Sequence, residues 1–276
     1  MAVPITGAAR GQGRSHAVRL AGKSADIMAI GVCEGNDVAT YPMTSAADLK
    51  ETVWLVEKTG RRVVVGQVEV CDYAALKSAI GEAIAELGRL VAVIPNAGTP
   101  PTGAAPPADA FTGVLDVNRL GMGNTVQTAQ PHPGEEGSAV AVGSIMSFLS
   151  PGLDDSTAGR GMAAYKLAKH VLVDYINVLA SQLAQSGSRA NAVQPTNLGT
   201  DILLNDPVYT TFWPGLGHPT EEDAAPLMAG VNAMSTAYVD TSDVSSAILS
   251  LVSDESRFIT GTHPKADAGA LVKQGG

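Results

Sequence analysis

Residues 6–13 read Thr6-Gly7-Ala8-Ala9-Arg10-Gly11-Gln12-Gly13 and connect a short apolar run to an alternating stretch containing Ala17, Val18, Leu20 and Ala21. The three segments predict a strand, a glycine loop and the start of a helix. Glycines let the backbone turn tightly and bring its amide groups against a pyrophosphate, which the positive end of the following helix also attracts. The loop therefore predicts a dinucleotide site, and an ordinary glycine-rich turn is the alternative.

Composition limits the classes of protein. The 276 residues show no linker, so we expect a single domain spanning 1–276. The 18 basic and 27 acidic residues give a net charge of −9 without a basic block, which argues against a nucleic-acid partner. Neither Cys33 nor Cys71 belongs to a metal-binding cluster, and the histidines are scattered, so we expect no metal site. Without a signal peptide or a long apolar run, we expect a soluble, cytoplasmic protein that does not enter a membrane.

Apolar, β-branched runs alternate with helical patterns along most of the chain, which predicts an α/β fold with a doubly wound parallel sheet flanked by helices, of the Rossmann type. One helix is expected after the cap Asp72, ending at Gly88, and a second over Met162–Gln185. Residues 99–107 and 150–160 are expected to be loops. The expected strands are Ala25–Val32, Arg62–Val70, Leu90–Pro95, Ser138–Val142 and Ala190–Val193.

Tyr165 and Lys169 lie four positions apart on the second helix, so the phenol and the ammonium group lie side by side. Alone, such a pair is common on solvated helix faces. Combined with the glycine loop, with Asn96-Ala97-Gly98, with Asn118 and with Ser144, the order and spacing resemble the short-chain dehydrogenase/reductase family, in its single-domain branch. Phe258-Ile259-Thr260-Gly261, followed by Asp267-Ala268-Gly269, resembles the closing segment of that family, so the resemblance covers the whole chain.

The resemblance implies a function and a set of roles. It implies an NAD(P)-dependent oxidoreductase that transfers a hydride between the cofactor and a secondary alcohol or ketone. Tyr165 would be the general acid/base, Lys169 its electrostatic partner, Ser144 the group that holds the substrate oxygen and Asn118 the anchor of a water relay. For Ser144 and Asn118, bonding to their own backbone is the structural alternative. The positions matching the family's cofactor contacts are Gly7, Arg10, Gly11, Gln12, Gly13, Gly31, Glu69, Val70, Asn96, Ala97, Gly98, Tyr165, Lys169, Pro195, Leu198 and Thr200.

A narrower resemblance concerns residues 10–17, an insert that runs from Cys33 through Tyr41 to Val53, and Pro195-Thr196 in place of Pro-Gly. These features are similar to the carveol-dehydrogenase-like, mycofactocin-coupled subfamily. That similarity implies an apolar or alicyclic substrate, NAD held so tightly that it does not exchange freely, and an external redox partner that recycles it. The wider family implies a homotetramer built through the helix that carries Tyr165.

The acid–base role of Tyr165 sets an electrostatic requirement. Lowering a tyrosine pKa from ~10 to ~7 requires about 4 kcal/mol, which one cation at ~4 Å supplies at an effective dielectric of ~20. We therefore expect Lys169 to lower the pKa of Tyr165. After Thr200, the aromatic side chains Tyr209, Phe212 and Trp213 suggest an apolar lid over the substrate, with ordinary packing as the alternative.

Three residues depart from the family pattern. Gly31 stands where an acid should bind the adenosine ribose and select NAD, so NADP is an alternative cofactor, with Arg10 able to meet its 2′-phosphate. Pro4 removes a hydrogen-bond donor from a central strand, and Arg119 follows Asn118 where a small or apolar residue is usual. A dinucleotide-binding regulatory protein, or a catalytically weak relative, is therefore the alternative function. Epimerases and dehydratases have a different glycine spacing, and enoyl reductases a wider Tyr to Lys spacing.

Overall fold

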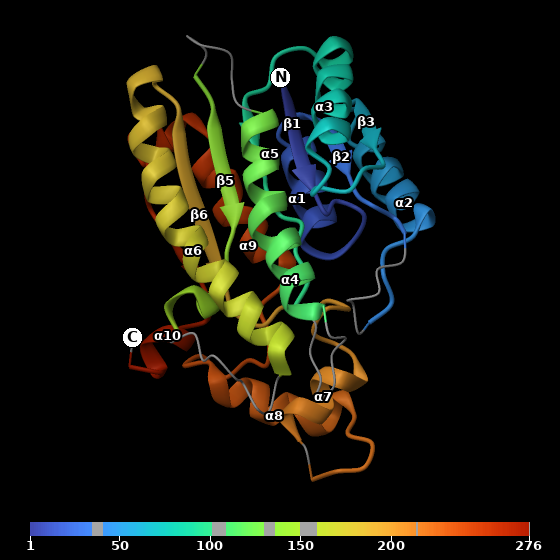
Figure 1. Ribbon diagram of the computed structural model, residues 1–276, viewed down its shortest axis with the longest axis vertical. Helices are drawn as coiled ribbons and strands as arrows, with labels where there is room; N and C mark the ends of the chain where they lie inside the picture. Colours follow the sequence, from blue (N-terminus) through green and yellow to red (C-terminus); the bar gives the residue numbers. More distant parts are fainter. Residues whose placement is uncertain (35–40, 101–108, 130–135, 150–158, 214, 276) are drawn as a thin grey trace.

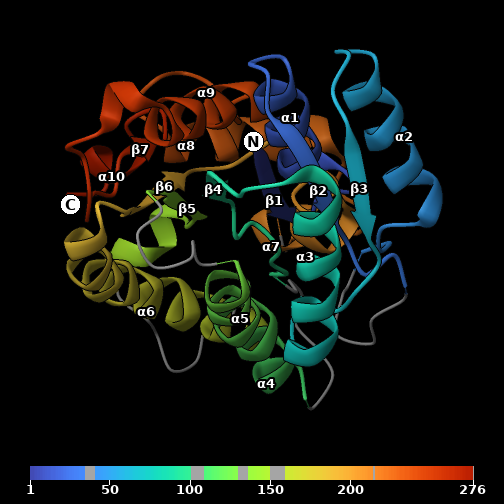
Figure 2. The ribbon, with the colours of Figure 1, turned by 90° about the horizontal axis from the view of Figure 1, so that it is seen from above.

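The computed structural model describes residues 1–34, 41–100, 109–129, 136–149, 159–213 and 215–275. Strands and helices alternate along this part of the chain, and the helices lie on both sides of a parallel sheet (Figures 1 and 2). The predicted α/β fold class is confirmed. In the described residues, no helix combines the length and the apolar content that a membrane span requires.

The strands are short and begin close to the predicted positions. The strands are β1 (Ala2–Thr6), β2 (Asp26–Ile30), β3 (Val63–Gly66), β4 (Ala92–Val93), β5 (Ser138–Val142), β6 (Arg189–Pro195) and β7 (Lys265–Ala266). The α-helices are α1 (Gly11–Ala21), α2 (Ala46–Glu57), α3 (Tyr73–Leu87), α4 (Ala110–Leu115), α5 (Met122–Thr128), α6 (Gly159–Leu183), α7 (Asp206–Phe212), α8 (Glu221–Val231), α9 (Thr241–Val252) and α10 (Ala270–Lys273). The short turns are the π-helix η1 (Asp116–Gly121) and the 3-10 helices η2 (Ile145–Phe148), η3 (Ala184–Ser186) and η4 (Asp254–Ser256).

All strand pairs are parallel, in two runs ordered β1-β2-β3 and β4-β5-β6-β7. Two isolated parallel bridges, Ala2 with Leu90 and Ile5 with Ile94, join the runs, which gives the doubly wound order 3-2-1-4-5-6-7. Pro4 lies between these bridges. The N–H groups of Ala2 and Thr6 donate towards β4, so the missing donor of Pro4 falls on the same seam. Because Pro4 cannot donate a backbone hydrogen bond here, β1 and β4 are paired through isolated bridges and not through a continuous ladder of hydrogen bonds.

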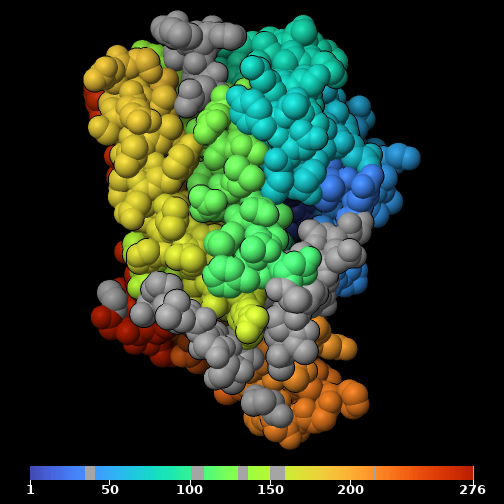
Figure 3. All heavy atoms as spheres, viewed as in Figure 1, coloured from blue at the N-terminus to red at the C-terminus, as the bar shows by residue number. Residues whose placement is uncertain are grey.

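Alternation along the strands builds one core on each face of the sheet. Val3 and Ile5 pack with α1, α2 and α9, whereas Met28 and Ile30 pack with α3, α5 and α6. Figure 3 shows α3, α5 and α6 as neighbouring bands on one face of the molecule. Since both faces of a parallel sheet are covered by helices, functional side chains concentrate at the edge where the strands end.

Several element ends differ from the prediction. The strand expected over Arg62–Val70 stops at Gly66, because residues 68–70 turn away to line a cavity. The helix expected from Met162 begins at Gly159, so Arg160 is helical rather than part of a loop. The helix expected after Asp72 is confirmed, with the Asp72 side chain accepting from the Ala75 N–H. Residues 101–107 and 150–158 of the two expected loops, and residues 35–40 of the insert, lie outside the described residues.

Candidate active site

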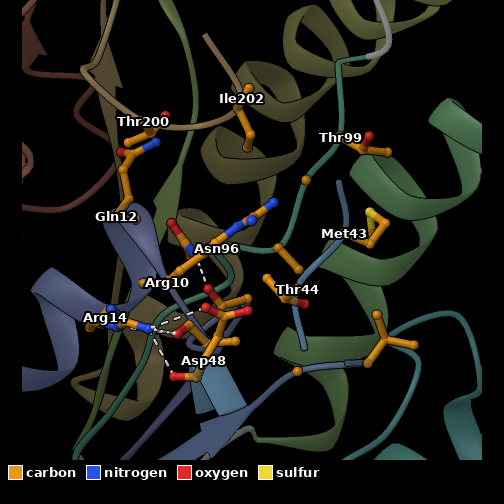
Figure 4. Close-up of a pocket in the computed structure, with 18 of the residues that line it drawn as sticks. Arg10, Gln12, Arg14, Met43, Thr44, Asp48, Asn96, Thr99, Thr200 and Ile202 are labelled. Carbon is orange, nitrogen blue, oxygen red and sulfur yellow. Dashed lines mark hydrogen bonds and ion pairs between the residues drawn. The ribbon is translucent and has the colours of Figure 1, made fainter. Parts of the chain in front are cut away.

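A cavity of about 490 Å³ opens at the carboxyl ends of β1, β2 and β4. The glycine loop forms one wall, and the loop after β4 and the segment after β6 lie beside it (Figure 4). The N-terminus of α1 begins at Gly11, inside this wall, so its free backbone N–H groups and dipole favour an anion there.

The loop conformation depends on glycine at three positions. Gly7 and Gly11 have φ values of +67° and +56°, which other residues rarely adopt. A Cβ on Gly13 would overlap the carbonyl oxygen of Gly7, so the first turn of α1 packs directly on the loop. Asn96 fixes this arrangement, since its Nδ2 donates to the Thr6 carbonyl at 2.9 Å. The result is a cradle formed by the backbone at these three glycines, and it fits a pyrophosphate.

Most of the predicted cofactor positions meet in this cavity. Its lining includes Gly7, Arg10, Gly11, Gln12, Gly13, Gly31, Glu69, Val70, Asn96, Ala97, Gly98 and Thr200. Four of the predicted positions do not line it: Tyr165 and Lys169 lie on α6, Pro195 ends β6, and Leu198 is buried and bridged to Val239. Among the described residues, the buried Oε1 of Gln12 has no hydrogen-bond partner.

Arg10 lies across the cavity mouth. Its Nη1 pairs with the Asp201 carboxylate at 2.9 Å, and its Nη2 donates to the Pro42 carbonyl. The glycine loop, the insert and the segment after β6 are therefore joined by one guanidinium group.

Ser144, Tyr165 and Lys169 form a second cluster, which we call the catalytic corner. Ser144 follows β5, and its hydroxyl hydrogen-bonds the phenol of Tyr165 and accepts from the Met146 N–H. Lys169, one turn after Tyr165 on α6, donates from Nζ to the Val142 carbonyl at 2.8 Å. The same ammonium lies 5.4 Å from the centroid of the Tyr165 ring. The structure thus brings the three side chains together, and the side chains of Ser144 and Lys169 also form hydrogen bonds with backbone groups.

The electrostatics of the corner differ from the expectation. Burial raises the pKa of Tyr165 to about 12, and the Ser144 hydrogen bond only partly opposes it. Burial also lowers the pKa of Lys169 to about 8. In the protein alone, desolvation of the phenol therefore outweighs any lowering of the Tyr165 pKa by Lys169. At neutral pH the corner therefore holds a neutral phenol beside a protonated amine.

Asn118 lies in the π-helix η1 and connects the catalytic corner to the cavity. Its Nδ2 donates to the carbonyls of Thr99, at 2.9 Å, and Val114, at 3.0 Å. Its Oδ1 is buried and has no hydrogen-bond partner among the described residues. A Cβ built on the cavity-lining Gly98 would lie 2.7 Å from that oxygen and 3.8 Å from the Lys169 Nζ. The side chain of Arg119 points into solvent, so this departure leaves Asn118 buried in place.

Sequence reasoning missed Gln194, which is fully buried on β6. Its Oε1 accepts from the Ser144 N–H at 2.7 Å and from the Ser147 hydroxyl at 3.1 Å. A Cβ at Gly143 would overlap this carboxamide, so glycine there makes room for it. A glutamine directly after the apolar pair Ala192-Val193 of a buried strand was the available signal.

Tyr41, from the insert, was also not assigned a role. It is buried and donates to the Thr99 hydroxyl at 3.1 Å, close enough to Tyr165 to help raise its pKa. No local sequence signal indicates this contact, because the insert reaches the site through tertiary packing. In the aromatic segment, Tyr209 and Phe212 pack with α8 in a small hydrophobic core, as the packing alternative indicates, whereas Trp213 is exposed.

The described residues contain no group of three or more His, Cys, Asp or Glu side chains able to hold a metal ion. The glycine cradle, the sheet order and the Ser–Tyr–Lys cluster at the strand ends define a Rossmann-type dinucleotide-binding protein.

Comparisons with known proteins extend this result. The family model described as enoyl-(acyl carrier protein) reductase matches residues 7–270. The chain is 37% identical to (−)-trans-carveol dehydrogenase of Rhodococcus erythropolis, over 98% of this chain and 96% of the relative. It resembles the solved structure of carveol dehydrogenase from Mycobacterium avium in complex with NAD, with a TM-score of 0.92 and 37% identity over 98% and 97% of the two chains. A short-chain dehydrogenase from Mycobacterium paratuberculosis bound to NAD has a TM-score of 0.84 and 30% identity, over 99% and 97%. The chain belongs to the short-chain dehydrogenase/reductase family, and the sequence resemblance is confirmed.

Proposed function

We propose that the protein is an NAD-dependent dehydrogenase that interconverts a secondary alcohol and its ketone, with an apolar, alicyclic substrate. The observation that carries the proposal is the junction at Gly98, where the dinucleotide cradle meets Asn118 and Lys169 of the catalytic corner. The similarity to carveol dehydrogenases supports the substrate class. An enoyl reduction fits less well, because family members with that activity have a wider Tyr to Lys spacing than Tyr165 and Lys169.

The site residues divide the work between binding and proton transfer. The cradle of Gly7, Gly11 and Gly13 would hold the pyrophosphate, and the bound nicotinamide supplies the hydride acceptor or donor. In the proposed mechanism, Ser144 holds the substrate oxygen and Tyr165 exchanges a proton with it. Because Tyr165 is a neutral phenol in the protein alone, it is ready to donate a proton, as ketone reduction requires. Alcohol oxidation needs the phenolate, so it requires more positive charge near the phenol than Lys169 alone provides.

Tyr165→Phe tests this assignment. The variant should lose about 10³-fold in turnover of a cyclic secondary alcohol while its NAD content, measured by mass spectrometry of the purified protein, stays unchanged. Tyr175→Phe is the matched control, since Tyr175 lies on the same helix but packs against the core. A Tyr165→Phe protein that oxidised the alcohol at a near wild-type rate would remove Tyr165 from the mechanism.

We further propose that the cofactor stays bound between turnovers and is recycled by an external redox partner of the mycofactocin type. The contacts of Arg10 with Asp201 and Pro42 across the cavity mouth support slow exchange. In a test without added NAD, an artificial electron acceptor should sustain many turnovers, and its omission should allow only one. Full activity that depends on added NAD would contradict slow exchange.

A homotetramer is the proposed assembly. Leu167, Val171 and Val178 form one exposed apolar stripe on α6, of the kind that subunit interfaces cover. Light scattering during gel filtration should give four times the mass of the 28.2 kDa chain, and Val178→Lys should reduce it. A monomer at micromolar concentration would refute this assembly.

A further inference from the structure

The adenosine end of the cavity lacks the acid expected at the end of β2, where Gly31 stands. The surroundings of Gly31 leave room for a Cβ atom. A Cβ on Gly31 would meet the Cys33 Sγ at 3.5 Å and the Ala9 Cβ at 3.6 Å, which are ordinary contacts. In this fold an acid at that place accepts from the ribose hydroxyls and selects NAD over NADP. Another acceptor is therefore needed if this chain is to make the same selection.

Asp48, in the first turn of α2, lines the same cavity as Gly31. The helix is fixed against the glycine loop, because the Thr52 hydroxyl donates to the Ala8 carbonyl at 2.9 Å and the Arg14 Nη2 donates to the Asp48 carbonyl at 2.9 Å. Cys33, whose thiol would contact a Gly31 Cβ, has a pKa that burial raises, with a further contribution from the Asp48 charge. Asp48 thus lines the same cavity as Gly31 at the end of β2, and it lies beside Arg14 in Figure 4.

The two oxygens of Asp48 have different surroundings. Oδ2 accepts from the Ser45 N–H and hydroxyl, both at 2.7 Å, and these bonds hold the Asp48 pKa below its usual range. Oδ1 accepts no hydrogen bond from the described residues, and its nearest cation is the Arg14 Nη2 at 3.9 Å. An ionised carboxylate with one uncommitted oxygen is suited to accept a hydroxyl proton.

Both arginines that line the cavity in the described part of the chain already have acidic partners. Arg10 pairs with Asp201 at 2.9 Å, and Arg14 pairs with Glu51 at 2.7 Å. A 2′-phosphate near Asp48 would therefore meet a carboxylate and would have to displace an existing ion pair to gain a cation. The charges favour a hydroxyl over a phosphate.

We propose that the Asp48 carboxylate binds the 2′-hydroxyl of the adenosine ribose and makes this chain selective for NAD in place of the missing acid at Gly31. The inference rests on the proposed function in one respect, namely that the cavity holds a dinucleotide. It concerns the choice between two dinucleotides and is independent of the chemistry at Tyr165.

Calorimetric titration of the full chain, stripped of nucleotide, with NAD⁺, NADP⁺, 5′-AMP and adenosine 2′,5′-bisphosphate tests the proposal. The wild type should bind NAD⁺ and 5′-AMP at least tenfold more tightly than their 2′-phosphorylated counterparts. Asp48→Asn should weaken NAD⁺ binding by about tenfold and reduce or reverse the preference. Asp223→Asn is the matched control, because Asp223 has the same capping-box role at the start of α8 but is not among the residues that line the cavity. This control should keep the wild-type preference.

An unchanged preference in a folded Asp48→Asn protein would overturn the proposal while leaving the proposed function intact. A wild type that binds neither dinucleotide would overturn both. If Asp48→Asn does not fold, Gly31→Asp decides the question without removing Asp48. With the 2′-hydroxyl already bound by Asp48, the added acid should change NAD⁺ affinity less than threefold, whereas a tenfold gain would show that the hydroxyl lacks an acceptor in the wild type.

Discussion

The glycine loop and the catalytic corner, to which the proposed function assigns one reaction, are constructed differently. The loop presents backbone, and its shape depends on the missing side chains of Gly7, Gly11 and Gly13. The corner presents side chains, and its shape depends on buried polar partners such as Gln194 and the Val142 carbonyl. A site made of backbone tolerates many neighbouring side chains but no added Cβ. A site made of side chains depends on each hydrogen bond that orients them.

Two of the three departures from the family pattern, Pro4 and Gly31, lie near the loop, whereas the third, Arg119, follows Asn118 in η1. Ser144, Tyr165 and Lys169 are all present in the corner. Four measurements test the contrast, ordered from the largest expected effect to the smallest.

Acid should destabilise the glycine-loop side through His16, which is buried on α1 against Ser245 of α9. Burial lowers the His16 pKa from 6.5 to about 3, so the folded state binds fewer protons than the unfolded chain between these values. Stability is therefore complete above pH ~6.5 and falls by up to about 4 kcal/mol as the pH drops to ~3. Urea unfolding at pH 7 and pH 4 should show a smaller loss for His16→Gln than for wild type, and equal losses would exclude this role.

Gly13→Ala should break the cradle. Its Cβ would overlap the Gly7 carbonyl, so we expect a loss of about 3 kcal/mol in unfolding free energy and of at least 100-fold in NAD⁺ affinity. Gly31→Ala is the matched control on the same cavity wall, because its Cβ would make only ordinary contacts. Calorimetry and urea unfolding measure both variants. Equal effects of the two substitutions would contradict a backbone-made cradle.

Gln194→Ala should disturb the corner without affecting the loop. It leaves the Ser144 N–H and the Ser147 hydroxyl without their buried acceptor, at a cost of about 2 kcal/mol in stability. We expect turnover to fall about tenfold while NAD⁺ affinity is unchanged, because Ser144 loses its orientation. Ser147→Ala removes only one of the two donors and should keep most of the turnover. A matching fall in NAD⁺ affinity would show that the two regions are not separable.

Pro4→Val should have the smallest effect. It restores an N–H at the seam between β1 and β4 but releases the backbone restriction of proline. The net change should be a stabilisation of at most about 1 kcal/mol, measured by urea unfolding, with no change in turnover. A destabilised variant would indicate that the two bridges are the preferred pairing of this seam.

The fold could be predicted because its signals are local. Alternating apolar runs located five strands, and the Asp72 cap located the start of α3. Strand ends were less predictable. Val68, Glu69 and Val70 continue an apolar pattern but turn towards the cavity, and only the tertiary structure determines that turn.

Individual residues of the site could be predicted from the sequence, but the contacts between residues far apart in the sequence could not. Resemblance identified Ser144, Tyr165 and Lys169, whereas Gln194 and Tyr41 reach the corner from positions far away in the sequence. The sign of the Tyr165 pKa shift could not be predicted either. It depends on how deeply the phenol is buried and on the carbonyl that Lys169 selects, and neither is encoded in the spacing of the two residues.

The direction in which the Asn118 side chain points depends on the π-helix η1. A π turn holds one residue more than an α turn, so deleting a single residue from Asp116–Gly121 could leave one continuous α-helix from α4 to α5. Each residue in an α-helix advances the side chains by about 100°. The helix would survive such a deletion, but the Asn118 amide would rotate away from Gly98. The number of residues in this helical segment is thus itself a functional property. A one-residue deletion that preserves the fold could still remove the link that Asn118 makes between the cavity and the catalytic corner.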